Sequence, residues 1–242
     1  LEGTQVRLVV APGLQDVVPG RMRALTVTQG WTGLIAVKTR RTRAIGKALF
    51  DRLAGAIGLA LISPLLAATA IAIRIDSPGP VFYTQTRVGQ NGKPFTMWKF
   101  RSMYIDSDAR RASVVKAGGD AGNEVMFKDR QDPRITHVGR WIRRLSIDEL
   151  PQLINVVRGD MSLVGPRPAL PVEVAKYDAE ALRRLLVKPG LTGLWQISGR
   201  SDLSWASTVA LDRHYVENRG GALDAKIFAG TLRAVIGGKG AY

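Results

Sequence analysis

The longest apolar run of the chain lies in its first third. From Leu53 to Ile73 there are 21 residues without a charge, and Arg52 and Arg74 flank them. At about 1.5 Å per residue, a continuous helix of this length spans about 30 Å, which is the thickness of the hydrocarbon core of a bilayer. The pattern therefore predicts one membrane-associated helix within residues 41–75.

A Ser63-Pro64 pair interrupts this run at its midpoint. Proline lacks an N–H and clashes with the carbonyl group four residues earlier, so it predicts a bend, and the Ser63 hydroxyl can bond to a freed carbonyl oxygen. Three arrangements are compatible: a kinked transmembrane helix, a re-entrant helix with both ends on one side of the membrane, or a buried helical hairpin of a soluble protein. Basic residues at both flanks favour the re-entrant form, because Lys and Arg mark cytoplasmic ends. Lys47 and Arg52 favour an interfacial anchor, because long basic side chains reach lipid phosphates.

Strand patterns lie on both sides of the apolar run. Short apolar segments at 6–10, 25–27 and 34–37 predict strands separated by Gly and Pro. Segments 81–85 and 95–100 are rich in β-formers, and the turn signal Gln90-Asn91-Gly92-Lys93 lies between them. These two segments predict a hairpin that places Lys99 and Arg101 at one end, where the two cations either bind phosphate or are merely solvated.

Helical spacing returns in the second half of the chain. Apolar residues recur at the helical interval in the positions Val138, Trp141, Ile142 and Leu145. Ser146 followed by Glu149 is a capping-box signature for a second helix that ends at Gly159. Because Pro151 follows, either Asp148 is itself the cap or the opening turn is irregular. In both cases Asp148 and Glu149 stand at a helix N-terminus, whose partial positive charge favours an ionised Asp148 and whose N–H groups can bind a phosphoryl oxygen.

Composition changes the picture mainly through charge. A chain of 242 residues allows one domain with attachments or two small domains. Its 45% hydrophobic and 23% charged residues are near the averages for folded proteins, whereas the net charge of +15 is not. An anionic partner is expected: nucleic acid, an anionic membrane surface or a phosphorylated small substrate. The absence of cysteine excludes disulfides and thiolate metal sites.

Basic residues cluster around the Asp148-Glu149 pair. Those near it in sequence are Arg143, Arg144, Arg158 and Arg167. The segment Gly165-Pro166-Arg167-Pro168 predicts a rigid turn that fixes the direction of a guanidinium suited to bidentate phosphate binding. Arg200 follows a predicted loop at Pro189–Gly193. Helix capping alone is the competing explanation of Asp148, and the clustered arginines favour phosphate chemistry instead.

Metal binding is restricted by the histidines. His137 and His214 are the only two, and neither lies in a metal-ligand pair or beside a candidate serine nucleophile. Both are therefore expected to be structural. A Mg²⁺ ion held by the carboxylates of Asp148 and Glu149 remains compatible with the sequence.

A series of motifs from about Ala44 to the C-terminus resembles bacterial monotopic phosphoglycosyl transferases, the polyprenyl-phosphate sugar-1-phosphate transferases that begin exopolysaccharide, capsule or O-antigen assembly. The motifs are Lys99-Phe100-Arg101-Ser102-Met103, Asp132-Pro133-Arg134-Ile135-Thr136, Leu145 to Gln152, Asn155-Val156, Gly159 to Pro168 and Pro189-Gly190-Leu191-Thr192-Gly193. The resemblance implies an α+β fold: a mostly helical, membrane-associated catalytic domain at 76–242 with a small β-hairpin, a re-entrant helix at 41–75 broken at Ser63-Pro64, and at 1–40 the remnant of an upstream domain and linker.

The resemblance also implies a reaction. Asp148 matches the family nucleophile, which attacks the β-phosphorus of a UDP-sugar, releases UMP and passes the sugar phosphate to polyprenyl (undecaprenyl) phosphate. Glu149 matches the second member of the dyad, which organises Mg²⁺ or activates the lipid phosphate. Residues on family phosphate-binding positions are Arg143, Arg167 and Arg200, with Lys99 and Arg101 as weaker assignments. Lys47, Asp51 and Arg52 are expected at the lipid headgroups.

The expected partners are a UDP-sugar of the glucose or galactose type, polyprenyl phosphate and membrane lipid at the cytoplasmic face of the bacterial inner membrane, and a homodimer is compatible with the family. Nucleic acid is not expected, because the arginines cluster around one dyad instead of spreading along a face with interleaved aromatic residues. Two other classes compete with this reading: a basic binding module whose carboxylates only cap a helix, and a glycosyltransferase that transfers sugar without phosphate and releases UDP.

Overall fold

The structure is a computed structural model that describes residues 9–10, 22–27, 31–37, 41–105, 107, 132–199 and 203–236, with side chains described between residues 45 and 234 of these ranges. The chain divides into two units, Leu1–Lys47 and Ala48–Tyr242. The first unit contains the antiparallel strands β1 (Val9–Val10), β2 (Met22–Val27) and β3 (Trp31–Val37) in the order β1-β3-β2. The strands expected within residues 1–38 are thus confirmed.

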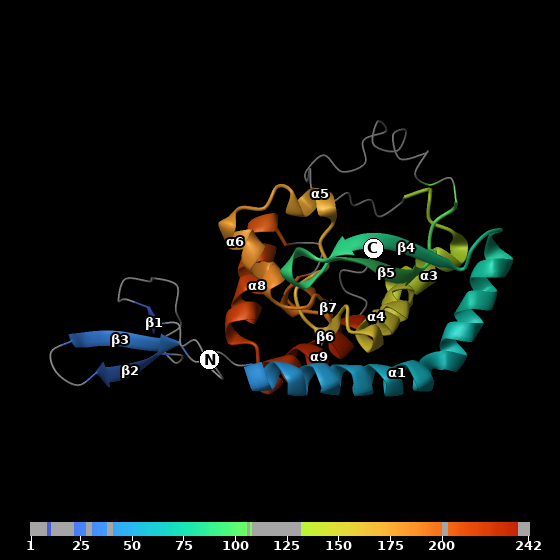
Figure 1. The fold of residues 1–242 in the computed structure, drawn as a ribbon. Helices are drawn as coiled ribbons and strands as arrows, with labels where there is room; N and C mark the ends of the chain where they lie inside the picture. Colours follow the sequence, from blue (N-terminus) through green and yellow to red (C-terminus); the bar gives the residue numbers. More distant parts are fainter. Residues whose placement is uncertain are drawn as a thin grey trace. The chain divides into compact units, whose positions relative to one another are not determined.

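The apolar run forms one long helix, α1 (Arg41–Asp76), with Pro64 inside it. The helix changes direction partway along its length in Figure 1. The Ser63 hydroxyl donates a hydrogen bond of 2.8 Å to the carbonyl oxygen of Ala60, which is the carbonyl that Pro64 leaves without its helical donor. The bend and the role of Ser63 are therefore confirmed. In the described part of the chain, this is the one helix long and apolar enough to cross a membrane.

The predicted hairpin is present as β4 (Phe82–Val88) and β5 (Pro94–Phe100), with pairs running from Phe82↔Phe100 to Val88↔Pro94. A single turn of 3-10 helix, η2 (Gln90–Gly92), connects the strands. Met97 of β5 is buried in a cluster with Val156 and Met161. This packing fixes the hairpin against the helix that follows the two carboxylates in the chain.

That segment departs from the predicted capping box. Helix α3 (His137–Arg144) is confirmed, and after it Ser146 adopts a left-handed conformation with φ of 56°. The Ser146 N–H bonds to the carbonyl of Arg143, so Ser146 completes the end of α3 and lacks the extended conformation of an N-cap. The carboxylates lie instead on a 3-10 helix, η3 (Ile147–Gln152), which precedes α4 (Leu153–Arg158). The irregular opening turn and the end at Gly159, with φ of 90°, are confirmed.

Two short strands pair in parallel: β6 (Ser162–Val164), which directly precedes the turn expected at 165–168, and β7 (Gly190–Thr192), which lies within the loop expected at 189–193. The pairing continues into the segment around Arg167, because the Gly190 N–H bonds to the Pro166 carbonyl at 2.8 Å and the Gly165 N–H to the Thr192 carbonyl at 2.9 Å. A Cβ atom on Gly165 would lie 2.5 Å from the Lys188 carbonyl oxygen. The glycine thus permits a close approach of two backbones. The loop expected at 189–193 is wrong, because Gly190–Thr192 forms β7, whereas the turn expected at 165–168 follows β6 and stays a prediction.

The remaining elements are helical. They are α5 (Pro171–Val174), α6 (Ala179–Leu182), η4 (Arg183–Leu186), α7 (Leu194–Ile197), α8 (Trp205–Asn218) and α9 (Gly221–Ile236). Ile227 of α9 is buried against Val164 and Tyr215, whereas Phe228 and Leu232 are exposed. The side chains of Val235 and Ile236 lie outside the described residues.

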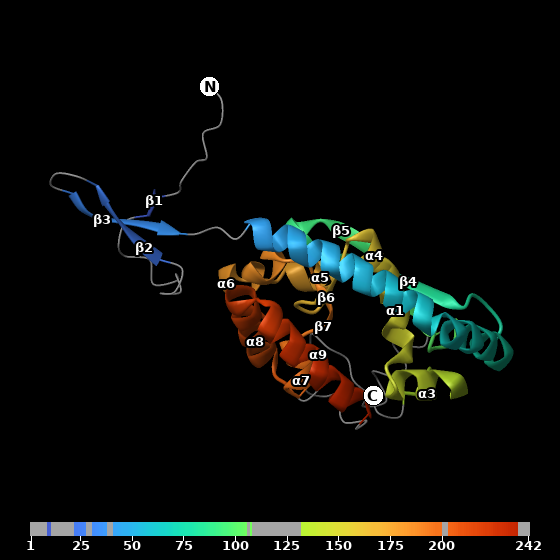
Figure 2. The same ribbon diagram turned by 90° about the horizontal axis from the view of Figure 1, so that it is seen from below.

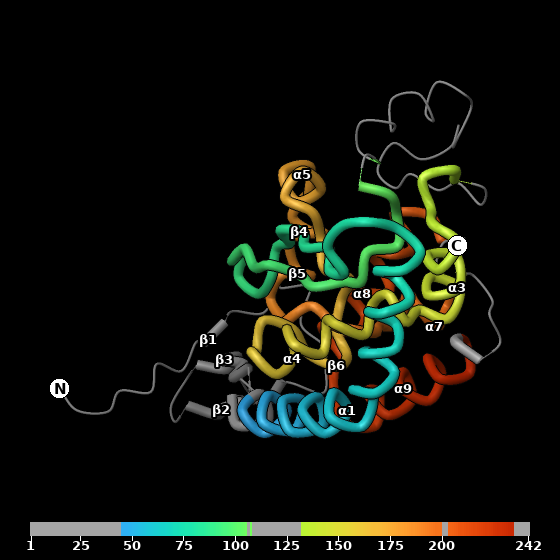
Figure 3. The backbone as a smooth tube through the Cα atoms, turned by 90° about the vertical axis from the view of Figure 1, so that its right-hand side faces the viewer, coloured from blue at the N-terminus to red at the C-terminus, as the bar shows by residue number. Residues whose placement is uncertain are grey.

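Helices α1 and α9 lie on the same side of the second unit, along the lower edge in Figures 1 and 3 and toward the viewer in Figure 2. Exposed apolar side chains on α1 include Leu53, Ile57, Leu61 and Ile71. The α+β class, mostly helical with a small hairpin and one long apolar helix, is confirmed. Residues 106–129, whose mixture of charges and glycines predicts a helix end and a loop, lie, apart from Ser107, outside the described residues.

Candidate active site

Asp148 and Glu149 lie next to each other on η3, which packs against strand β5. The Lys99 Nζ atom of β5 lies 2.7 Å from the Glu149 Oε1 atom. Both side chains are partly accessible, with 24% and 32% of their surface exposed. The hairpin therefore brings the cation predicted at its end into contact with the predicted dyad.

Burial raises the pKa of the Asp148 carboxyl group to about 6, and the neighbouring Glu149 carboxylate acts in the same direction. Lys99 and Arg143 oppose this rise. The favourable charges and the helix N-terminus do not hold the pKa of Asp148 at its ordinary value, because the loss of solvent outweighs them. At neutral pH the group remains mostly ionised and is poised close to its titration point, as a nucleophile or base requires.

The predicted arginines have different environments. Arg143, at the end of α3, is near enough to Asp148 to lower the pKa of that carboxyl group. Arg167 donates a hydrogen bond of 3.2 Å from its Nη1 atom to the Oε1 atom of Glu173, whose other carboxylate oxygen accepts the N–H of Leu170 at 2.7 Å. The buried Glu173 thus orients a guanidinium that is itself partly accessible. Arg200 lies outside the described residues.

Arg101 does not join this group. Its side chain is 6% exposed, and its guanidinium donates to the carbonyl oxygens of Pro78 and Ser77 at 2.6 and 2.7 Å and to the Ser77 hydroxyl at 2.9 Å. These contacts fix the segment that follows α1. The prediction that Arg101 binds phosphate is corrected to a structural role, because its guanidinium is buried and held by hydrogen bonds to Ser77 and Pro78.

Arg87 is a site residue that the sequence reasoning missed. Its Nη1 atom donates to the carbonyl of Pro168 at 2.9 Å, and both Glu149 and Arg167 are near enough to affect the pKa of its guanidinium. Alternation along β4 offered a signal, because Tyr83, Gln85 and Arg87 fall on one face of the hairpin and Tyr83 pairs with Lys99. The basic residues around the dyad therefore include Arg87.

A buried ion pair between Arg184 and Asp212 lies next to the backbone of Arg167. The Arg184 Nη2 atom lies 2.6 Å from the Asp212 Oδ2 atom, with 2% and 1% of the two side chains exposed. The Arg184 guanidinium also lies over the rings of Tyr177 and Trp205. Burial raises the pKa of Asp212 to about 6, while Arg184 and the backbone N–H of Arg167 oppose the rise.

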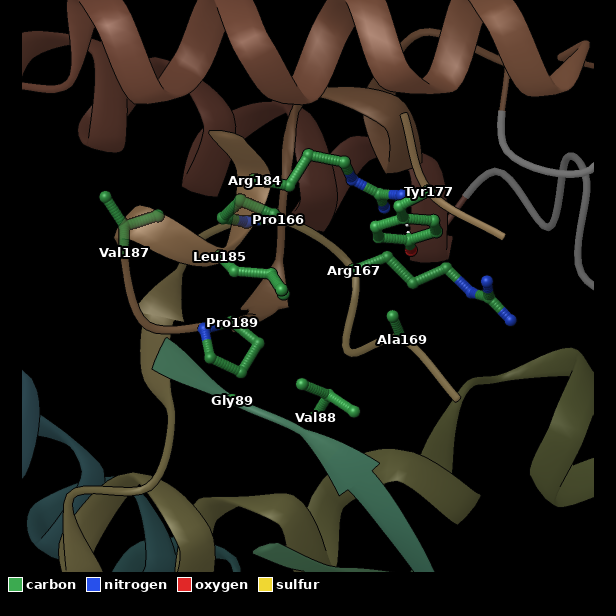
Figure 4. A pocket seen from close by; sticks show the side chains of 10 residues that line it. All are labelled: Val88, Gly89, Pro166, Arg167, Ala169, Tyr177, Arg184, Leu185, Val187 and Pro189. Atoms are coloured by element: carbon green, nitrogen blue, oxygen red, sulfur yellow. Dashed lines mark hydrogen bonds between the residues drawn. The ribbon is translucent and has the colours of Figure 1, made fainter. Parts of the chain in front are cut away.

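Figure 4 shows Arg167, Tyr177 and Arg184 around a small pocket whose other walls are mainly apolar. Those walls are formed by residues from β4, from the segment after β6 and from the segment before β7, among them Val88, Ala169, Leu185, Val187 and Pro189. The pocket lies beside the Arg167 guanidinium and not at the dyad.

Lys47, Asp51 and Arg52, the three residues expected at the lipid headgroups, have different environments. Asp51 of α1 is 4% exposed, and its Oδ2 atom accepts the Ser162 hydroxyl of β6 at 2.5 Å. This contact attaches α1 to the strand pair, so the expectation that Asp51 lies among lipid headgroups is corrected. Arg52 is exposed, and Lys47 is half-buried.

The two carboxylates of the dyad are possible ligands of Mg²⁺. Within the described ranges, no group of three or more His, Asp or Glu side chains could hold a metal ion. Mg²⁺ is commonly bound by one or two carboxylates together with substrate phosphates and water. Asp148 and Glu149 therefore suit Mg²⁺ that arrives with a phosphate-bearing substrate, and do not form a complete metal cage by themselves.

Adjacent carboxylates among lysine and arginine side chains, on a unit with one long apolar helix, indicate an enzyme that acts on phosphate esters at a membrane. Comparison with known proteins agrees with this class. A model of the bacterial sugar transferase family matches residues 42–238. The chain belongs to this family and is an enzyme of the transferase class.

Three relatives illustrate the family. The chain is 41% identical over 226 residues to the exopolysaccharide production protein ExoY of Rhizobium meliloti, with 91% of this chain and 100% of the relative covered. It is 41% identical to the undecaprenyl-phosphate galactose phosphotransferase of Salmonella typhimurium, covering 84% of this chain and 43% of the relative. It is 43% identical to the undecaprenyl-phosphate glucose phosphotransferase of Komagataeibacter xylinus, covering 81% and 37%. The chain thus spans all of the first relative and less than half of the other two.

Proposed function

We propose that the protein transfers a sugar-1-phosphate from a UDP-sugar to undecaprenyl phosphate and releases UMP, as an initiating step of exopolysaccharide, capsule or O-antigen synthesis. The observation that carries the proposal is the Asp148-Glu149 pair, which lies in contact with Lys99 and within the field of Arg143. The names of the relatives support a sugar phosphate as the group transferred and a lipid phosphate as its acceptor.

The reaction has two displacements at one phosphorus atom. A carboxylate oxygen of Asp148 attacks the β-phosphorus of the donor, and the bond from that phosphorus to the bridging oxygen breaks, so UMP leaves with the bonding electrons. A phosphate oxygen of the polyprenyl chain then attacks the same phosphorus, and the bond to Asp148 breaks. The carboxylate is restored, and the sugar is left on a lipid diphosphate.

The neighbouring side chains have distinct parts in this scheme. Lys99 holds Glu149 next to the nucleophile, and Arg143 stabilises negative charge close to it. Arg167, oriented by Glu173, and Arg200 bind phosphate oxygens. Mg²⁺, held by Asp148 and Glu149 together with substrate oxygens, would supply further charge neutralisation during transfer.

The same proposal assigns α1 a re-entrant path into the cytoplasmic leaflet of the inner membrane. The bend at Pro64 and the exposed apolar side chains on both sides of it support this path. Helix α9 lies on the same side of the unit as α1, and its exposed Phe228 and Leu232 would add apolar surface for lipid contact. The lipid-linked acceptor would then reach the dyad without leaving the membrane.

The identity of the nucleotide product tests this function. The full chain in detergent is incubated with undecaprenyl phosphate, Mg²⁺ and a panel of UDP-sugars that includes UDP-glucose and UDP-galactose. The proposal predicts that UMP forms and that Asp148→Asn abolishes its formation. Release of UDP would instead identify a glycosyltransferase that transfers sugar without phosphate, and normal turnover by Asp148→Asn would exclude the aspartate nucleophile.

A further inference from the structure

Arg87 is a cation beside the dyad for which the scheme above has no role. It projects from β4 close to the turn of the second unit's hairpin, on the face that carries Lys99 farther along the neighbouring strand. Its guanidinium is half-buried and fixed in place, because Nε and Nη2 donate to the Gln85 Oε1 atom at 3.0 and 2.6 Å and Nη1 donates to the Pro168 carbonyl at 2.9 Å.

These contacts leave part of the guanidinium available. Arginine has five N–H donors, and three are accounted for by Gln85 and Pro168, so two remain. Both acceptors are neutral groups. The protein therefore fixes the plane of the guanidinium without neutralising its charge.

The charges around Arg87 do not provide a counter-ion. Among the described residues, no carboxylate forms an ion pair with Arg87, and the charge that affects it most is the like charge of Arg167. The carboxylates nearby already contact other cations, Glu173 with Arg167 and Glu149 with Lys99. Burial and Arg167 accordingly lower the pKa of Arg87 to about 10. Two neighbouring cations in a partly buried site cost free energy that a bound anion would recover.

We propose that Arg87 is a direct ligand of a substrate phosphoryl group, which it binds together with Arg167. This inference rests on the proposed function and adds a residue to its substrate site. A diphosphate has enough negative charge to neutralise both guanidiniums, which favours the nucleotide donor, although the phosphate of the lipid acceptor has the same chemistry. A guanidinium already held by Gln85 and Pro168 loses little conformational freedom on binding.

Binding measurements on the full chain in detergent micelles test the proposal. The Asp148→Asn chain is used as the parent so that no turnover occurs, and UDP is titrated by calorimetry into the parent and into versions that also carry Arg87→Met or Arg87→Lys. Loss of a charge-assisted hydrogen bond predicts about 10-fold to 100-fold weaker UDP binding for Arg87→Met. Arg87→Lys should lose less, because it keeps the charge. Arg183→Met, which removes a guanidinium paired with Glu180 and Glu217, is the matched control and should bind UDP like the parent.

Two readouts separate contact from structural support. If Arg87 only holds the Pro168 segment, Met and Lys will weaken binding equally and in proportion to a lower unfolding temperature, which would overturn the proposal. If Arg87→Met leaves UDP binding unchanged, the KM for undecaprenyl phosphate is measured for Arg87→Met in the chain that retains Asp148. A KM at least tenfold higher would assign Arg87 to the acceptor phosphate, and an unchanged KM would overturn the proposal. If the parent binds neither UDP nor any UDP-sugar, the proposed donor fails, and titration with undecaprenyl phosphate alone then decides the role of Arg87.

Discussion

At the scale of single residues, the environment of Asp148 determines when it can act as a nucleophile. Burial raises its pKa to about 6, so its carboxyl group is protonated below that pH and ionised above it. The donor reaction, followed as UMP release at low donor concentration, should lose rate as the pH falls through about 6 and approach a tenfold loss per further unit. Because the neighbouring Glu149 carboxylate affects the titration of Asp148, the observed midpoint belongs to the pair. A rate that stays constant down to pH 4.5 would contradict this.

Lys99 sets the position of that midpoint. It is the strongest of the charges that lower the pKa of Asp148. The substitution Lys99→Met should therefore move the acidic limb of the rate profile to higher pH, by about one unit. The control is Lys93→Met, which removes a lysine exposed beside the hairpin turn and should leave the midpoint unchanged. Coincident profiles for wild type and Lys99→Met would show that Lys99 exerts no effect through Asp148.

Sequence reasoning identified most of the charged residues at the site but not their partners. Motif order placed Asp148, Glu149, Lys99, Arg143 and Arg167 together, and the structure brings the first four into one electrostatic group. The sequence could not distinguish Lys99 from Arg101, because both are basic residues at the same end of the predicted hairpin. Only the structure shows that Arg101 bonds to the segment Ser77-Pro78.

At the scale of elements, a buried polar contact attaches α1 to the strand pair. The Ser162 hydroxyl donates to Asp51, and both side chains are nearly inaccessible. Ser162→Ala removes a donor from a buried carboxylate and should lower the free energy of unfolding by about 1 to 3 kcal/mol. Unfolding followed by circular dichroism in detergent measures this cost. Ser207→Ala, at an exposed position of α8, is the control, and an equal effect of the two changes would contradict the assigned contact.

Pro64 determines the path of α1 in the proposed membrane arrangement. Pro64→Ala restores the missing N–H and should straighten the helix so that it crosses the bilayer. Because the chain contains no cysteine, single cysteines can be introduced at Gly46 and Ile75 and labelled from either side of membrane vesicles. With Pro64 present both should react from the cytoplasmic side, and with Pro64→Ala they should react from opposite sides. Opposite-side labelling of the proline-containing chain would exclude the re-entrant path.

Elements with strong local signals were predictable, and those that depend on distant partners were not. The hairpin and α3 follow from alternation, turn residues and helical spacing. Strands β6 and β7 contain three residues each and exist because Gly165 and Gly190 allow two backbones to approach, a contact invisible to local patterns. Ser146 matches a capping box in the sequence, but in the structure its N–H bonds to the Arg143 carbonyl, so Ser146 ends α3 and does not cap the next helix.

At the scale of the whole molecule, the second unit combines an apolar surface with a charged site. Helices α1 and α9 provide exposed apolar side chains on one side, and the dyad lies on η3 against the hairpin. Family membership was predictable from the motifs, which extend over most of the chain. The sugar was not predictable, because the motifs are assigned to the phosphates and the reaction, and none of them identifies a residue that would recognise a sugar hydroxyl.

The central claim is that Asp148 carries the sugar phosphate between donor and acceptor. The most direct measurement is peptide mass spectrometry of the chain after brief incubation with the UDP-sugar that supports UMP release, without undecaprenyl phosphate. The account predicts a hexose phosphate on the peptide that contains Asp148, formed together with an equal amount of UMP, and its disappearance when undecaprenyl phosphate is added. UMP release without any modified peptide, or the same adduct in Asp148→Asn, would contradict the account.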